Sequence, residues 1–408
     1  MNESDNKKMK IVLITTGQPS INPRIVKEAD ALTKAGHIVI VLYCHWVPWA
    51  DEADNEILAG AKWKAVLVGG SPAKNKTAYL ISRVWFKFYR KLAILGFLKT
   101  TIAEQAQARA FKALLKTAKN NKADYYIAHN LGALPVAVLA AEANNAKAGF
   151  DFEDYHRGEV KNKKPADEQR IVHLEDKYIS RCKYISFASP MIGEKVLENF
   201  PKFQGKTKVI YNCFPLIEKS PQKDVTKKQL KLFWFSQTVG ADRGLITALV
   251  ALKLINDPLI KLTIVGQVSD QIKKYFFSIL ENSKVQLDFS GVVSPKEIDE
   301  LAARSDVGLA LEMLEPENRN LCLTNKIFTY LAAGNAIIFS ETSAQEKFCQ
   351  ENKAGLLYKT GDAEALAKSI RFYQDEENLL YQKKHNRKLA ETTFNWETES
   401  QKLVALLD

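Results

Sequence analysis

The stretch LTNKIFTYLAAGNAIIFS, residues 323–340, predicts a short helix that leads into a buried strand. Asn325 suits the N-cap of that helix, because its side chain can accept a hydrogen bond from a free backbone N–H. Gly334 suits the helix end, and the apolar residues after it favour a strand. Asn325, Lys326 and Thr329 fall on one face, beside the partial positive charge of the helix N-terminus. An ordinary capped helix has the same pattern, but such a helix start also suits phosphate.

Strands and helices alternate along the rest of the chain. A strand at Lys10 to Thr15 precedes a helix from Arg24 to Ala35, with Asn22 as its N-cap, and a strand from His37 to Cys44. Further strands are predicted at 63–68, 125–129, 149–152, 184–188, 209–211, 231–235, 261–265, 285–289, 307–311, 336–339 and 355–358. A capping box at Ser294 and Glu297 begins a helix, and residues 396–407 form the last one. This alternation indicates parallel sheets covered on both faces.

The composition changes once, between the two series of strands. We expect an α/β fold of two doubly wound Rossmann-like domains, at residues 1–212 and 230–390. The stretch 213–229, rich in proline and lysine, is predicted to be the linker, and residues 391–408 a C-terminal helix.

The overall composition is that of an ordinary globular protein. The 408 residues are 46% hydrophobic and 26% charged, which excludes a largely disordered chain. The five cysteines are scattered and form no zinc or redox motif, and the polar first ten residues do not resemble a secretory signal. We therefore expect a cytoplasmic protein.

The net charge of +11 indicates an anionic partner. Residues 79–101 carry apolar residues at near-helical spacing with Arg and Lys between them, as in helices that lie in a membrane interface. A helix that buries its aromatic face and leaves its lysines in water fits the same pattern. Nucleic acid is disfavoured, because stacking aromatics alternate with basic residues only in this segment.

Two loops at strand ends contain glycines, as nucleotide-binding motifs do. The first has Gly17 but no further glycine before its helix, and Cys44 and His45 stand where a ribose-binding carboxylate would follow, which argues against NAD. The second, within FWFSQTVGADRGLITALVAL at 233–252, has Gly240 and Gly244, which allow close approach of a ligand. Arg243 there precedes a helix whose N-terminus suits an anion.

The stretches 323–340 and 233–252 resemble the corresponding segments of the retaining glycosyltransferases of the GT-B fold, in particular family 4. The resemblance implies two Rossmann-like domains facing a cleft, an acceptor-side N-terminal domain, and a last helix that crosses back onto it. It implies that the donor nucleotide sugar contacts Gly17, Gln237, Gly240, Asn325 and Thr329, and that Arg243 and Lys326 stabilise the departing diphosphate. It also implies that no metal is obligatory and that no other cofactor is needed.

The sequence departs from the family pattern at three positions. Leu321 and Thr329 stand where two glutamates are usual, and Gln237 stands where an arginine is usual. A threonine offers one hydroxyl where a carboxylate could accept from both ribose hydroxyls. Glu312, Glu315 and Glu317 follow the strand at 307–311; a solvated acidic loop is the preferred interpretation, and a glutamate that faces the donor sugar is the alternative.

The N-terminal candidates lie at strand ends and in the first loop. His129 and Asn130 match a pair that the family places near the transferred sugar, and a structural histidine is the alternative. The stretch FDFEDYHRGE, 150–159, contains Glu153 as an acceptor-side candidate and carboxylates that make a metal site conceivable, although we expect none. Asn22 and Arg24 complete the acceptor side, where Arg24 suits an anionic acceptor.

We therefore hypothesise a glycosyltransferase that moves a sugar from a nucleotide-diphosphate donor to a glycan or lipid-linked acceptor, with retention, in surface polysaccharide or glycolipid synthesis. Its expected place is the cytoplasm, with peripheral attachment to the inner face of an anionic membrane through residues 79–101. A nucleotide-sugar 2-epimerase and a non-catalytic nucleotide-sugar or glycan binding protein remain as alternatives.

Overall fold

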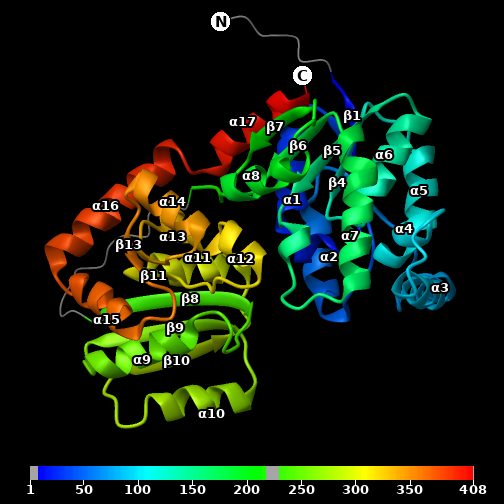
Figure 1. Ribbon diagram of the computed structural model, residues 1–408. Coiled ribbons are helices and arrows are strands. Elements are labelled where there is room, and N and C mark those ends of the chain that lie inside the picture. The colour runs from blue at the N-terminus through cyan, green and yellow to red at the C-terminus, as the bar shows by residue number, and fades with distance from the viewer. Residues whose placement is uncertain (1–7, 217–228, 408) are drawn as a thin grey trace, which may run out of the picture. The chain divides into compact units, whose positions relative to one another are not determined.

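The computed structural model describes residues 8–216 and 229–407 (Figure 1). The chain divides into two compact units, Met1–Ile210 with Ser400–Asp408, and Tyr211–Glu399, called unit 1 and unit 2 below. Most of the predicted linker, residues 217–228, lies outside the described residues. Each unit is a parallel sheet with helices on both faces, which confirms the predicted fold of two doubly wound Rossmann-like domains.

The sheet of unit 1 has seven strands in the order β3-β2-β1-β4-β5-β6-β7. They are β1 (Lys10–Thr15), β2 (Ile38–Tyr43), β3 (Lys64–Leu67), β4 (Tyr125–His129), β5 (Lys147–Phe152), β6 (Tyr184–Phe187) and β7 (Lys206–Val209). The central strands are buried along nearly their whole length, because helices cover both faces.

The helices of unit 1 connect these strands in chain order. They are α1 (Pro23–Lys34), α2 (Asp51–Gly60), α3 (Lys76–Ile94), α4 (Ile102–Gln107), α5 (Phe111–Asn120), α6 (Leu134–Ala143), α7 (Pro165–Tyr178) and α8 (Pro190–Asn199), with short 3-10 turns at Pro19–Ile21, Pro48–Ala50, His156–Gly158 and Ile179–Arg181. The last helix, α17 (Trp396–Leu407), has its residues from Ser400 onward in this unit.

The sheet of unit 2 has six strands in the order β10-β9-β8-β11-β12-β13. They are β8 (Leu230–Thr238), β9 (Ile260–Gln267), β10 (Gln286–Gly291), β11 (Val307–Ala310), β12 (Ala336–Ser340) and β13 (Leu356–Tyr358). The helices are α9 (Leu245–Ile255), α10 (Asp270–Ile279), α11 (Pro295–Ala303), α12 (Glu317–Leu321), α13 (Asn325–Ala333), α14 (Ser343–Asn352), α15 (Ala363–Phe372) and α16 (Glu376–Thr392).

The two faces of this second sheet pack against different helices. One face presents Leu232, Trp234 and Leu309 to apolar residues of α9 and α15. The other face presents Phe233 and Phe235, whose rings lie 6.1 and 5.9 Å from that of Tyr330 on α13. This alternation along β8 is the period-two pattern of a strand that is covered on both sides.

Most predicted elements agree with the structure, and the deviations lie at their ends. Asn22 caps α1, accepting a hydrogen bond from the backbone N–H of Ile25, and the capping box of Ser294 and Glu297 is present. The last strand of unit 1 lies earlier than predicted, because the edge strand β7 (Lys206–Val209) has mostly exposed residues and gives little apolar signal. The final helix begins at Trp396, whereas residues 391 and 392 end α16.

Asn325 is not the N-cap of α13, which corrects the sequence prediction. Thr324 has the extended N-cap conformation, and Asn325 is the first helical residue. The amide of Asn325 instead accepts a hydrogen bond from Asn212, at 2.6 Å between Nδ2 and Oδ1. The helix therefore begins one residue earlier than its best capping residue suggested.

A glycine in β11 sets how closely α13 approaches the sheet. The ring of Tyr330 lies over Gly308, where an added Cβ would come within 2.2 Å of ring carbon Cγ. The hydroxyl of Tyr330 donates to the carbonyl oxygens of Phe233, at 3.1 Å, and Leu309, at 3.3 Å. Tyr330 therefore fixes α13 on the strands that lead to the candidate site.

Gly308→Ala should destabilise unit 2 by about 1–3 kcal/mol, because the new methyl group overpacks the contact with Tyr330. The measurement is the free energy of unfolding of each unit in urea. Gly60→Ala is the control, since an added Cβ at Gly60 meets nothing within 4 Å. Equal stability of the two variants would contradict the packing described here.

Candidate active site

Charged side chains gather at one place in each unit, and the two sets are described separately. In both sets, residues that follow or end neighbouring parallel strands meet residues of a helix that packs on the sheet: Lys326 of α13 in unit 2, and Arg24 and Glu28 of α1 in unit 1. We call them the Glu312 cluster of unit 2 (Arg243, Glu312 and Lys326) and the His129 cluster of unit 1 (Arg24, Glu28, His129 and Asp151).

Glu312 is a buried carboxylate of unit 2 and follows the end of β11. It is 1% exposed, so its interpretation as part of a solvated loop is wrong. Its backbone N–H donates to Ser340 Oγ at 2.8 Å, and that hydroxyl lies 3.0 Å from the hydroxyl of Tyr358. These bonds join the ends of β11, β12 and β13 beside the carboxylate.

Lys326 provides the buried cation of the cluster. Its Nζ donates to Glu312 Oε1 at 3.0 Å and lies 5.5 Å from the centre of the Trp234 ring. The side chain is 5% exposed, so its positive charge is held in place. Removing one partner of a buried pair leaves the other charge uncompensated, which makes the pair a fixed part of the fold.

Arg243 is the accessible cation of the cluster. Its side chain is 33% exposed, and its Nη1 lies 3.7 Å from Glu312 Oε1. Gly244 follows it as the N-cap of α9, with φ of +77°, and a Cβ there would lie 3.1 Å from that of Leu311. Glycine therefore allows the loop to turn close to the end of β11 and presents Arg243 at the sheet edge.

Arg319 of α12 holds the loop that carries Arg243. It donates to the backbone oxygen and to Oδ2 of Asp242, both at 2.8 Å. These hydrogen bonds and the charge of Arg319 keep the pKa of Asp242 below its ordinary value. No signal in the sequence near residue 242 indicates this contact, because it joins residues 77 apart.

The charges of this site do not balance. Two cations and the N-terminus of α13 face a single carboxylate, because Lys326 lies in the first turn of that helix. Glu312 Oε2 and the hydroxyl of Thr324 are buried, and neither has a hydrogen-bond partner within the described part of the chain. The site can therefore accept an anion beside Arg243, its accessible cation.

The remaining donor-side candidates are dispersed. Gln237 is exposed at the end of β8, close in sequence to Gly240, so both lie near the loop of Arg243. Thr329 is 2% exposed within α13 and has no surface to offer a ribose. Gly17 belongs to unit 1.

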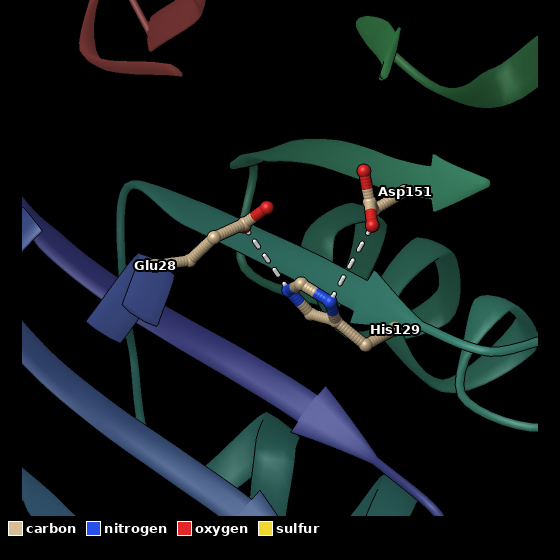
Figure 2. Close-up of side chains that lie close together, drawn as sticks. All are labelled: Glu28, His129 and Asp151. Carbon is tan, nitrogen blue, oxygen red and sulfur yellow. Dashed lines mark ion pairs between the residues drawn. The ribbon is translucent and has the colours of Figure 1, made fainter. Parts of the chain in front are cut away.

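The His129 cluster lies in unit 1 between α1 and the sheet (Figure 2). Strand register places His129, Asp151 and Ser186 in one row across β4, β5 and β6. His129 Nε2 lies 3.2 Å from Glu28 Oε2 of α1, and its Nδ1 lies 3.7 Å from Asp151 Oδ2. The imidazole is completely buried, so the hypothesis that it contacts a sugar is not supported by its position.

Arg24 completes this cluster and corrects another prediction. Its Nε and Nη2 donate to the two carboxylate oxygens of Asp151, at 2.6 and 2.8 Å, and its Nη1 donates to the carbonyl oxygen of Ile210 at 2.8 Å. Arg24 is completely buried, so it cannot bind an anionic acceptor in this arrangement. The first turn of α1 faces the sheet, whereas the sequence-based prediction placed these residues in a loop that faces the ligand.

The four groups stabilise one another's charged forms. Burial opposes protonation of His129, but Glu28 and Asp151 raise its pKa above the ordinary value. Burial also opposes ionisation of Asp151, yet Arg24 and His129 keep its pKa low. Arg24 therefore pairs with Asp151, and the imidazole of His129 lies between the carboxylates of Glu28 and Asp151.

Glu28, His129 and Asp151 also have the composition of a metal site. One ligand atom from each lies within 4.8 Å of the others, and an imidazole with two carboxylates suits a transition metal. However, Arg24 occupies both oxygens of Asp151, and its Nε lies 3.5 Å from Glu28 Oε1. A divalent cation would lie beside a guanidinium, so the arrangement fits an ion-pair network better.

The other acceptor-side candidates have structural contacts. Asn22 is the N-cap of α1. Asn130 has a positive φ of 76°, donates to Thr15 Oγ1 and accepts from Thr16 Oγ1, both at 2.9 Å, so it joins the ends of β1 and β4. His156 pairs with Glu175 of α7 at 3.3 Å and does not join the carboxylates of Asp151 and Glu153.

Glu153 differs from these candidates because one of its carboxylate oxygens has no hydrogen-bond partner in the described part of the chain. This oxygen, Oε1, is buried. Burial, followed by the negative charge of Asp151, raises the pKa of Glu153 to about 7. Glu153 therefore changes its protonation near neutral pH.

Sequence reasoning missed Glu28, Arg319 and the burial of Glu312. Glu28 lies in an amphipathic helix in which a glutamate is expected to face water, and its partner is 101 residues away. The spacing of Glu28 four residues after Arg24 was a usable signal, because it places both on one helix face.

Glu153→Gln should stabilise unit 1 at pH 8 by about 1–3 kcal/mol, because the folded state disfavours the carboxylate. The protonated glutamate contributes stability below its unfolded pKa, and this contribution is lost as the pH rises through about 7. The gain should therefore shrink as the pH falls from 8 towards 5. Thermal unfolding across this range, beside the exposed Glu168→Gln control, tests it; a gain independent of pH would contradict it.

Comparison with known proteins agrees with this architecture. Residues 217–396 match the family described as Glycosyl transferases group 1. No curated protein sequence matches the chain.

Solved structures similar to the whole chain include glycosyltransferases and a sucrose-phosphate synthase. HepE of Anabaena, in complex with UDP and glucose, has a TM-score of 0.68 at 16% identity, covering 98% of this chain and 99% of its own. A glycosyltransferase of Rickettsia africae has a TM-score of 0.68 at 15% identity, and sucrose-phosphate synthase of Thermosynechococcus elongatus 0.68 at 16%, each covering 98% of both chains. The chain therefore has the GT-B fold, and residues 217–396 carry the sequence pattern of the group 1 glycosyltransferases.

Proposed function

We propose that the protein transfers a sugar from a nucleotide-diphosphate donor to an acceptor, with the donor diphosphate bound beside Arg243. The observation that carries this proposal is the Glu312 cluster. An accessible arginine, a buried lysine–glutamate pair and a helix N-terminus meet at the carboxyl edge of a parallel sheet. This is the place where open α/β sheets bind phosphorylated ligands.

The chemistry that this edge offers is stabilisation of a leaving group. Breaking the bond between sugar and diphosphate leaves negative charge on the departing phosphate, and fixed positive groups lower the energy of that state. Arg243 can contact the phosphate directly, because a third of its side chain is exposed. Lys326 acts as a positioning residue, since its ammonium is held by Glu312.

Glu312 supports the donor site from below. It is 1% exposed, so it acts through the two cations that it holds, Lys326 at 3.0 Å and Arg243 at 3.7 Å. The usual glutamates of the family pattern are replaced by Leu321 and Thr329. We infer that Glu312 positions Arg243 for the diphosphate and that the donor ribose is held by other groups.

Several finer features belong to the same proposal. HepE of Anabaena has been solved with UDP-glucose, so a UDP-sugar is the first donor to test. Retention of anomeric configuration and an acceptor in surface polysaccharide or glycolipid synthesis follow from the family resemblance. Arg243 and the start of α13 supply the positive charge that the diphosphate needs, so we propose that no metal is obligatory.

Two other functions fit the same donor site. A nucleotide-sugar 2-epimerase would act on the donor without an acceptor, and a binding protein would hold the nucleotide sugar without turnover. Release of nucleotide that depends on the acceptor distinguishes the transferase from both.

Arg243→Ala should weaken binding of UDP or a UDP-sugar by roughly 10- to 100-fold, because a hydrogen bond to a charged group contributes about 1.5–3 kcal/mol. The measurement is the thermal shift of the purified protein with each nucleotide, since a ligand that binds the native state raises the melting temperature. Arg304→Ala is the matched control, because Arg304 is exposed elsewhere in unit 2. An equal shift for Arg243→Ala and the wild type would exclude the assigned role.

The pair Glu312 and Lys326 can be tested separately from folding. Glu312→Leu or Lys326→Met alone should cost about 3–5 kcal/mol, because each leaves one buried charge without its partner. The double variant should recover most of this stability while sugar transfer stays abolished, as followed by nucleotide release with acceptor. A stable double variant with normal turnover would show that the pair is structural only.

A further inference from the structure

Helix α3 (Lys76–Ile94) has two apolar faces, and only one of them packs on unit 1. The inner face carries Tyr79, Ser82, Phe86, Tyr89 and Ala93, which recur every three or four residues and are buried or partly buried. This face lies against α4 and α7, and in Figure 1 the helix lies at the margin of unit 1, beyond α4. The packing of α3 therefore leaves its opposite side in solvent.

The outer face is apolar and exposed. Leu80, Ile81, Val84, Trp85 and Phe88 follow the same helical spacing on the side away from the core, and each is 47–67% exposed. After the helix, Leu95 is 70% exposed and Phe97 57%. A contiguous apolar face of this size on one helix indicates a binding surface, because scattered apolar residues would not line up.

Two tryptophans lie on a neighbouring loop. Trp46 is 52% exposed and Trp49 is 67% exposed. The same loop contacts the first turn of α3, since the ring of His45 lies 5.5 Å from that of Tyr79. Tryptophan is favoured at the boundary between lipid and water, where its ring is partly apolar and its N–H is hydrated.

The chain segment that carries this face has charges of one sign, although Asp167 of the neighbouring α7 lies 3.5 Å from Arg90. Residues 57–103 contain nine Lys and Arg and no Asp or Glu, in a protein whose net charge is +11. Lys87 and Lys91 are exposed on α3 itself, next to the apolar face. The partner must therefore be apolar at the helix and negatively charged beside it.

We propose that α3 docks unit 1 on an anionic lipid bilayer, with Trp85 and Phe88 among the acyl chains and Lys87 and Lys91 at the phosphate level. A second copy of the chain fits this face less well, because it would bring the same excess of positive charge to the contact. Within the described ranges, no helix is both long and apolar enough to cross a bilayer, so the attachment is to the surface. This inference stands apart from the proposed transfer reaction.

The test is flotation of the full-length protein with vesicles of phosphatidylcholine alone and of phosphatidylcholine mixed with phosphatidylglycerol. We expect binding to the mixed vesicles only, weaker at high salt. Lys87→Ser with Lys91→Ser should reduce partitioning roughly thirtyfold, since each basic residue near an anionic surface contributes about fivefold. Trp85→Ser with Phe88→Ser should abolish it.

Matched controls come from unit 2. Lys368→Ser with Lys384→Ser removes two exposed lysines, and Leu380→Ser with Tyr381→Ser removes two apolar residues that are 47% and 72% exposed. Both controls should float like the wild type, and all variants should unfold at the wild-type temperature. Absence of wild-type flotation, or equal flotation of the α3 variants, would overturn the proposal. A dimer in solution that Trp85→Ser with Phe88→Ser converts to monomer would identify the face as a protein interface instead.

Discussion

The constraint on which both candidate sites depend is the parallel alignment of neighbouring strands. Parallel strands end at one edge, so residues that are distant in sequence meet there whenever they follow strands that pair. In unit 2 this brings Glu312, Ser340 and Tyr358 into one hydrogen-bonded chain across β11, β12 and β13. In unit 1 the same register aligns His129, Asp151 and Ser186. The helices that begin or pass at these edges then decide which groups stay accessible.

The two clusters differ in how far their side chains are buried, and this decides which of them a ligand can reach. The members of the His129 cluster are completely buried, and their contacts hold α1 and Ile210 on the sheet. The Glu312 cluster has one accessible member, Arg243. An anion can therefore reach the second cluster and cannot reach the first. Accessibility, more than residue type, distinguishes a candidate ligand site from a structural network here.

The sequence was sufficient to predict the helices and strands but not the side-chain contacts between them. The strands at Lys10–Thr15 and Tyr125–His129 and the helix Trp396–Leu407 were predicted to the residue, because apolar period and capping residues are local signals. The contacts of Arg24, Lys326 and Glu312 were not, since each depends on a residue brought close by the fold. Polar residues at a sheet edge could be assigned to the edge, but whether each side chain faces a helix or the solvent has no local signature.

The arrangement of α13 shows why stability and ligand binding are linked in unit 2. Lys326 lies in the first turn of the helix, where the helix dipole disfavours a cation, and burial disfavours it further. Glu312 offsets this cost, but its own burial demands a cation, and the second oxygen remains without a hydrogen-bond partner among the described residues. Arg243 is the accessible member of the cluster, so an anion bound there would offset the excess positive charge around α13. In the proposed function that anion is the donor diphosphate, and its binding would stabilise the folded state of this unit.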